Sequence, residues 1–301
     1  MSAPRKQHYV PQTYLKNFLP ANHKTSQLYV LSVPRGEIYL SHIRDIAAER
    51  NFYTIDHLDN KYLWEETYAK SIEPLLSHII KKYRQRCENS LIQNCATVLD
   101  PGDKFSLSLS IFFQLFRGKH TRDFEKQVYD RELPLIIKKV KESMGLLNED
   151  NEKKLLEFEK NEDLFKSISI PTLFDKERIL TYAYILMQYN FVFYRIAGPG
   201  SFITSDNPVM LTNCITFDTT PFTNGIANPT TMLFFPLSSK LLLGAYHPEM
   251  FRGCRTKYDG ILEILSKDRE EVFILNHNTK QREHCKEFVY SPSREALEQI
   301  R

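Results

Sequence analysis

The fold is decided by the stretch DPGDKFSLSLSIFFQLFRG, residues 100–118 of this 301-residue chain. A turn, Asp100-Pro101-Gly102, comes first, and the residues from 103 to 118 would then be apolar on nearly every side of a helix. Their large apolar members are Leu107, Leu109, Ile111, Phe112, Phe113, Leu115 and Phe116. Because a helix that is apolar all round is buried all round, we expect it at the centre of the molecule.

Amphipathic helices are predicted on both sides of this central helix. Apolar residues recur at steps of three and four from Trp64 to Ile79, which is the spacing of one helix face. Pro74 falls inside this pattern and either kinks the helix or marks a break, since proline cannot donate the helical hydrogen bond. Further helices are predicted over 120–144 and 176–194, so that residues 61–196 form a helical region.

The two ends of the chain carry strand-like patterns. A short helix is predicted after Pro11, which suits a first helical position, and a hairpin over 27–33 and 37–41 around a Pro-Arg-Gly turn. Beyond residue 196, short apolar runs predict strands and two helical patterns follow. The strand-like runs are 201–204, 209–212, 232–236 and 241–246, and the helical patterns cover 256–266 and 269–284.

These patterns together predict the α+β class, with helices and sheet in separate parts of the molecule. We expect an N-terminal helix and hairpin, a central helical bundle, and a small C-terminal antiparallel sheet with helices. Residues 1–301 are expected to form a single domain. Its sub-regions are 1–60 with the N-terminal motif and hairpin, 61–196 with helices, and 197–301 with mixed sheet and helix.

Composition excludes several familiar kinds of site. The chain has only 10 glycines, well below the usual share of ~7%, and none of the glycine-rich loops that hold phosphate, so it has no nucleotide cofactor motif. The GxSxG sequence of esterases is missing as well. The 5 cysteines include no CxxC pair, which indicates reduced thiols in a cytoplasmic protein. No apolar run approaches the ~20 residues that cross a membrane, so no membrane partner is expected.

Arg117 ends the central apolar helix, and a cation in that position must be paired or lie at the edge of the core. It is therefore a candidate for binding a phosphate or a carboxylate, while an internal salt bridge to a glutamate is the plainer interpretation. The whole chain carries a net charge of only +3. Residues 115–141, however, hold eight Lys and Arg against four Asp and Glu, a balance of 8 − 4 = +4 that would attract nucleic acid.

Two motifs place polar side chains beside structure-forming residues. His8 stands before the Pro11 helix, where free N–H groups favour a neutral imidazole that can act as a base or a metal ligand; capping or packing is the alternative. The loop Thr204-Ser205-Asp206-Asn207-Pro208 joins two strand-like runs and can aim a carboxylate. Its alternative is an Asx-turn, in which Asp206 or Asn207 bonds its own backbone.

Glu66 and Glu73 are seven residues apart, which places both near one face of the predicted helix. Two inward carboxylates could bind a metal ion or serve as general acid and base, while a solvated helix face is the alternative. His277, His284 and Cys285 match no zinc spacing, and we assign them to the core.

The start of the chain, His8-Tyr9-Val10-Pro11 followed by Tyr14-Leu15 and Phe18, resembles the opening of the domain-of-unknown-function family 4238. Many relatives carry two histidines in this motif, whereas Gln7 precedes His8 here. The resemblance implies a mostly bacterial protein, and because some members look like anti-phage defence proteins it also implies a defence role. It continues over almost the whole chain, through Asn51-Phe52-Tyr53, the Glu66 to Glu73 helix, Arg117 to Arg122, Phe202 to Val209, Phe235 to Ser238, Leu275-Asn276 and Phe288 to Ser291.

The function that these residues predict is metal-assisted hydrolysis of phosphodiester bonds by a nuclease that acts in defence, with nucleic acid as its partner. The alternative is a non-enzymatic sensing or binding protein whose polar motifs form a structural network. A third option is hydrolysis or modification of a nucleotide cofactor held in an aromatic pocket. In the nuclease, the catalytic residues would be His8, Glu66, Glu73 and Asp206; the ligands of a divalent ion, Mg²⁺ or Mn²⁺, would be His8, Glu73 and Asp206; and the substrate-binding residues would be Tyr9, Arg117, Arg122 and Asn207.

Overall fold

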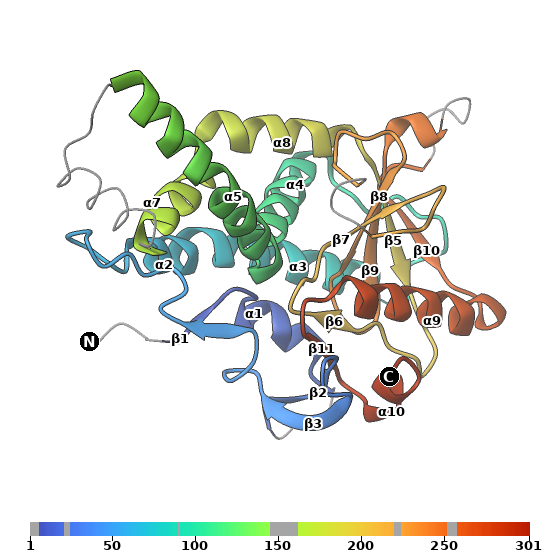
Figure 1. Ribbon diagram of the computed structural model, residues 1–301. Helices are drawn as coiled ribbons and strands as arrows, with labels where there is room; N and C mark the ends of the chain where they lie inside the picture. The colour runs from blue at the N-terminus through green and yellow to red at the C-terminus, as the bar shows by residue number, and fades with distance from the viewer. Residues whose placement is uncertain (1–5, 21–24, 90, 145–161, 220–223, 252–257) are drawn as a thin grey trace.

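The computed structural model describes residues 6–20, 25–89, 91–144, 162–219, 224–251 and 258–301. Within them the predicted α+β class is confirmed, because one group of helices and the two larger sheets occupy separate parts of the molecule (Figure 1). The helices between residues 63 and 188 lie together in one half, and the five-stranded sheet stands beside them with α9 (Lys267–His284) across it. In these described ranges, no helix combines the length and apolar character needed to cross a membrane.

Helix α4 (Pro101–Phe116) is the buried central helix that the opening stretch predicts. Pro101 stands in its first turn, and Leu107, Ile111 and Phe112 are fully buried along it. Its neighbours are α3 (Glu73–Cys87), α5 (Lys119–Met144) and α8 (Lys176–Gln188), which surround it in Figure 1. The remaining helix of this half is α7 (Glu162–Thr172), which packs on α5.

The helix predicted around Trp64 to Ile79 consists of three consecutive pieces. These are α2 (Leu63–Thr67), the π-helix η2 (Tyr68–Ile72) and α3. Pro74 lies in the first turn of α3 and can donate no hydrogen bond to the turn before it. The π-helix directly precedes this proline, so the predicted break takes the form of a wider helical turn that holds one extra residue.

Two predicted helices are wrong in part. The helix expected to run to residue 194 ends at Gln188, and Asn190–Arg195 forms strand β5. Within 256–266, Ile261–Ile264 forms strand β10, while residues 256–257 lie outside the described residues. The β5 run is buried on both faces of the sheet, and a short apolar run of that kind has no alternation that separates a strand from a helix. Strand β10 is a short edge strand in which only Leu262 is buried, so its pattern is too brief to identify.

The five-stranded sheet has the order β10-β5-β9-β8-β7. Only β10 pairs in parallel, with β5, so the expected antiparallel sheet carries one parallel edge strand. Its other strands are β7 (Met210–Asn213), β8 (Thr231–Pro236) and β9 (Leu241–Tyr246), and η3 (Pro248–Phe251) follows β9.

The four-stranded sheet, of order β3-β2-β11-β6, joins the two ends of the chain. The predicted hairpin pairs β2 with β3, and the late strand β11 adds to β2. The strand predicted over 201–204 is reduced to β6 (Thr204–Ser205), which borders β11. The other elements here are β2 (Gln27–Ser32), β3 (Glu37–His42), β11 (Phe288–Ser291) and α10 (Arg294–Glu298).

The N-terminal motif folds as the short strand β1 (Lys6–His8), which pairs with β4 (Ala48–Arg50). Helix α1 (Gln12–Leu15) and the 3-10 helix η1 (Lys16–Phe18) follow, as predicted from Pro11. One hydrophobic cluster, with residues from Tyr9 to Tyr290, connects these elements with the helices and the sheets. Two smaller clusters pack α9 on the five-stranded sheet and α10 on the four-stranded sheet. The cysteines of the described ranges, Cys87, Cys95, Cys214 and Cys285, are free thiols, while Cys254 lies outside those ranges.

Candidate functional site

The side chain of Gln7 connects the N-terminal motif, by hydrogen bonds, to the loop that follows β4. This side chain is 0% exposed. The Gln7 Oε1 accepts a hydrogen bond from the backbone N–H of Tyr53 at 2.6 Å, and its Nε2 donates to Thr54 Oγ1 at 3.0 Å. Gln7, which stands in place of a second histidine, therefore links the two segments by accepting one hydrogen bond and donating another.

A neutral histidine can also accept with one ring nitrogen and donate with the other, so Gln7→His is expected to remain close to the wild type in stability. Gln7→Leu leaves the buried N–H of Tyr53 without an acceptor and is expected to lower the free energy of unfolding by about 1–3 kcal/mol. Urea denaturation measures both. Lys6→Leu, next along β1 and exposed, is the matched control. Equal loss in Gln7→His and Gln7→Leu would contradict this role.

Arg117 lies at the C-terminal end of α4 and is only 2% exposed. Its Nε donates to Tyr53 Oη at 3.1 Å, and its Nη2 donates to the His8 carbonyl oxygen at 2.8 Å and to Glu73 Oε1 at 3.1 Å. The guanidinium lies 4.2 Å from the centre of the Tyr68 ring. Burial lowers the pKa of Arg117, but Tyr53, Glu73 and Tyr68 outweigh it and hold the pKa above its ordinary value. The internal salt bridge is thus present, with Glu73 as the carboxylate.

His8 lies beside the same ion pair. Burial lowers the pKa of its imidazole, although Glu73 and a backbone hydrogen bond at Ile43 oppose this, so the ring is neutral at pH 7. Two nitrogens of this region, His8 Nε2 and Arg117 Nη1, are buried and have no hydrogen-bond partner in the described part of the chain. Because both atoms are buried, a bulky substrate cannot reach them in this conformation.

Glu73 faces Arg117 as predicted, but Glu66 does not. The Glu66 side chain is 45% exposed and pairs with Lys70 at 2.8 Å. Glu65 takes the inward position, and burial raises its pKa to about 7, with Arg117 opposing and Glu73 adding to the shift. The cause is the π-helix η2, which lies between these residues and Glu73 and holds one extra residue. Glu65, eight residues before Glu73, therefore faces the same side as Glu73, whereas Glu66, seven residues before it, does not.

Arg122 joins this group from the first turn of α5. Its guanidinium lies 3.5 Å from the centre of the Phe52 ring and donates to the Phe52 carbonyl oxygen. It also lies 5.1 Å from the centre of Tyr53, the ring that Arg117 contacts. We name the whole group the Arg117 cluster; its members are His8, Tyr53, Glu65, Tyr68, Glu73, Arg117 and Arg122.

Asp206 has a different set of partners. Its Oδ1 accepts from the backbone N–H of Lys286 at 2.8 Å, and its Oδ2 accepts from those of Glu287 at 2.7 Å and Phe288 at 2.9 Å. The residue is 1% exposed, and burial raises the pKa of its carboxyl to about 6 although the three backbone hydrogen bonds oppose this. The carboxylate therefore holds the start of β11 in place. It neither forms the Asx-turn predicted as one alternative nor points out of the loop as a free carboxylate.

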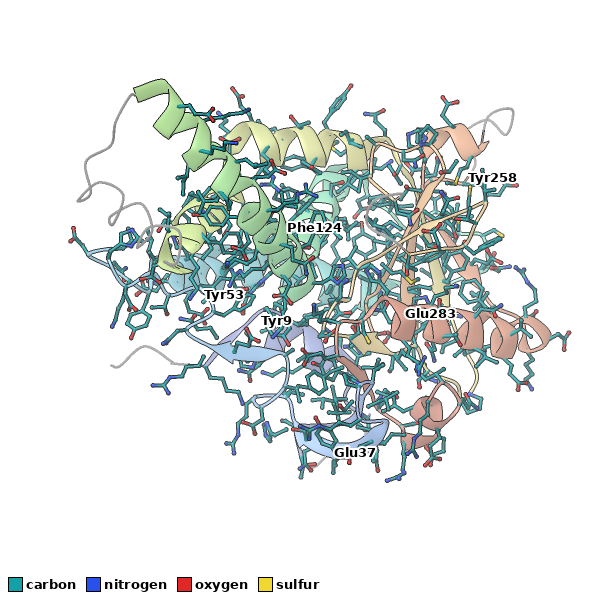
Figure 2. All side chains as sticks on the ribbon, viewed as in Figure 1. Tyr9, Glu37, Tyr53, Phe124, Tyr258 and Glu283 are labelled. Carbon is teal, nitrogen blue, oxygen red and sulfur yellow. The ribbon has the colours of Figure 1, made fainter. Side chains whose placement is uncertain are left out.

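Tyr9 connects the two regions. Its ring packs on Phe52 at 5.3 Å between centroids, and its backbone N–H donates to the Ala47 carbonyl oxygen. Burial raises the pKa of its phenol, and the negative charge of Asp206 adds to this. Figure 2 labels Tyr9 and Tyr53, which lie below α5 in that view. Tyr9 is 4% exposed, so its ring packs between the two motifs and presents little surface to a substrate.

Across the described ranges, no three His, Cys, Asp or Glu side chains are grouped so that they could hold a metal ion. His8 and Glu73 lie in the Arg117 cluster, whereas the oxygens of Asp206 already accept three backbone hydrogen bonds. The ligand set of His8, Glu73 and Asp206, with Mg²⁺ or Mn²⁺ as its ion, therefore stays a prediction.

Asn207, the next residue of the motif, belongs to a network with α9. Its Nδ2 lies 2.8 Å from His284 Nε2 and donates to the His284 carbonyl oxygen at 3.3 Å. Gln281 Nε2 donates to the backbone carbonyl oxygen of Asn207 at 2.8 Å. Gln281 Nε2 also donates to Ser205 Oγ at 2.7 Å. The Oδ1 of Asn207 accepts no hydrogen bond from a described residue and lies close to Gly118. Sequence reasoning missed Gln281 and placed His284 in the core only.

Asn207 and His284 lie in the wall of a cavity of about 430 Å³. Helices α4, α5 and α8 form one side of it, and the motif, β7 and the end of α9 form the other. Its aromatic lining residues are Phe116, Phe124 and Tyr182; Phe124, labelled in Figure 2, lies between α5 and the sheets. No pattern in the sequence indicates this cavity, because its walls come from segments that are far apart in the chain, including residues 219 and 224–227.

The cavity and the Arg117 cluster share one short segment, which we name the α4–α5 corner, residues 116–122. Phe116, His120 and Thr121 line the cavity. Arg117 and Arg122, from between and after them, belong to the Arg117 cluster. The turn between the two helices therefore presents one set of side chains to each region.

The fold and these contacts define an α+β protein with a buried polar network and an apolar cavity beside it. The family model described as protein of unknown function (DUF4238) matches residues 6–295, and the chain belongs to this family. No curated protein and no solved structure matches the chain.

Proposed function

We propose that the protein is a small-molecule binding protein that senses its ligand in the cavity between α4, α5, α8 and the sheet. One observation carries this proposal: Asn207, whose Oδ1 bonds no described residue, is held by His284 and Gln281 in the wall of that cavity. A largely apolar cavity of about 430 Å³ with few polar groups is typical of small-molecule sites.

The polar motifs then serve as the framework of this site. Asp206 fixes the segment that leads from α9 into β11, and so supports His284 at the end of α9. Arg117 fixes the end of α4 from which Phe116 enters the cavity. Buried hydrogen-bonded networks can specify a fold without taking part in chemistry.

Burial favours this function over the predicted nuclease. Phosphodiester hydrolysis needs a base and a cation that a phosphate can reach, and His8 Nε2 and Arg117 Nη1 are both buried. The Asp206 carboxylate already accepts three backbone hydrogen bonds, which leaves at most one lone pair on Oδ1 for a metal ion. The defence role implied by the family resemblance is a separate prediction, which a ligand sensor would serve equally well.

Binding of the uncharged dye N-phenyl-1-naphthylamine, whose fluorescence rises in apolar sites, tests the proposal. We expect saturable binding of one dye per chain. Thr181→Trp fills the cavity from the exposed side of α8 and is expected to weaken binding at least tenfold, about 1.4 kcal/mol. Leu180→Trp, its exposed neighbour outside the cavity wall, is the matched control and should bind as the wild type. No saturable binding by the folded protein, or equal loss in both variants, would refute the proposal.

A further inference from the structure

The ring-bearing wall of the cavity suits a flat molecule. Phe116 and Tyr182 meet edge to face, with 4.9 Å between centroids and 77° between planes, and so form a corner of two aromatic surfaces. Phe124 adds a third ring from α5. Aromatic side chains of this kind offer the faces on which a heterocyclic base stacks.

A short polar edge lies where the start of α5 faces the motif and the end of α9. The Asn207 Oδ1 is an acceptor with no donor among the described residues, and its amide nitrogen is fixed by His284. The ring nitrogens of His120 bond no described residue either, and its ring lies 5.9 Å from that of His284. A neutral imidazole offers one donor and one acceptor, so this edge matches a ligand that has both.

Among the described residues that line the cavity, none is Asp, Glu, Lys or Arg. Burial lowers the pKa of His120 below its usual value and that of His284 to about 4, so both rings are neutral at pH 7. Two cations that border lining residues are already paired. Arg178 lies 5.2 Å from the centre of the Phe116 ring and pairs with Glu125 at 3.6 Å, and Lys286 pairs with Asp123 at 3.0 Å.

From these observations we infer that the ligand is an uncharged nitrogen heterocycle, a nucleobase or its nucleoside, whose N–H edge donates to Asn207 Oδ1 and meets His120. The inference rests on the proposed function, since it names the ligand class of that same cavity. A nucleotide is disfavoured, because its phosphate would find no unpaired cation among the lining residues. An alkyl chain would leave the polar edge without partners.

Displacement of the bound dye by adenosine, inosine, uridine and thymidine tests the ligand class, with the 5′-monophosphate of each and 1-decanol as comparisons. We expect at least one nucleoside to displace the dye, and its monophosphate to do so at least tenfold more weakly. His120→Phe keeps the ring and removes the polar edge, so it should keep the dye and lose at least tenfold in nucleoside affinity. His78→Phe, on the exposed side of α3, should change neither.

The outcomes separate the two claims. If 1-decanol displaces the dye and no nucleoside does, the proposed ligand class is wrong and the proposed binding function remains. Equal binding of nucleoside and monophosphate, or nucleoside binding unchanged in His120→Phe, would overturn it as well. A folded protein that binds no dye refutes the proposed function itself.

Discussion

Replacement of Arg117 by methionine is expected to lower the free energy of unfolding by about 3–5 kcal/mol. The side chain donates to Tyr53 Oη, the His8 carbonyl oxygen and Glu73 Oε1, and it is 2% exposed. Methionine fills a similar space but leaves all three acceptors without their donor. Removal of one partner from a buried ion pair leaves the other charge uncompensated, which accounts for the size of the loss.

Chemical denaturation measures this effect, and Arg131→Met is the matched control. The Arg131 side chain is 74% exposed and pairs with its neighbour Glu132 in α5, so its loss should cost no more than about 1 kcal/mol. The double variant Arg117→Met with Glu73→Met removes the charge left behind and is expected to recover part of the stability. If Arg117→Met unfolded at the same denaturant concentration as the wild type, its role as a structural anchor would be wrong.

Asp206→Ala is expected to cost about 2–4 kcal/mol, because the backbone N–H groups of Lys286, Glu287 and Phe288 lose their acceptor. Asp206→Asn keeps one carbonyl oxygen and should fall between the wild type and Asp206→Ala. Asp45→Ala removes a half-exposed carboxylate that pairs with Lys6 and serves as the control, with an unchanged unfolding midpoint. A stable Asp206→Ala protein that had lost only a metal-dependent activity would instead support the predicted metal site.

The pH dependence of this effect has a definite sign. Burial raises the pKa of Asp206 from 3.8 to about 6, so the folded state binds more protons than the unfolded state between these values. The contribution of Asp206 to stability therefore falls as the pH rises from about 4 to about 6 and is constant above. The stability of the wild type relative to Asp206→Asn should decline across this window. Urea midpoints of both proteins, taken from pH 4 to pH 7.5, measure the decline.

The helical half of the fold could be predicted because its signal is local. The apolar residues of 103–118 give a central helix in any context, and α4 differs from the prediction only at its ends. The run at Phe191–Tyr194 carries no such signal, since an unbroken apolar stretch suits a buried strand and a buried helix equally. Only its pairing with β9 and β10, which are distant in the chain, makes it a strand.

The candidate site could be predicted in part for a related reason. His8, Glu73 and Arg117 were each chosen for their residue type, and the structure brings them into one cluster. Glu65 could not be chosen over Glu66, because the spacing rule assumes a uniform α-helix and η2 adds a residue between the two positions. The cavity was beyond reach from the sequence, since helices and loops far apart in the chain form it only after they have packed.

The α4–α5 corner has a mechanical consequence. Phe116 and His120 point to one side of it and Arg117 and Arg122 to the other, so the same backbone carries both sets. A ligand that displaces Phe116 and His120 must also displace Arg117 and Arg122. Through these arginines the displacement reaches β1 and the π-helix η2. The coupling free energy between two such regions is reciprocal. A variant that increases the mobility of the two arginines should alter the ligand affinity of the cavity, and ligand binding in the cavity should reduce the mobility of the arginines.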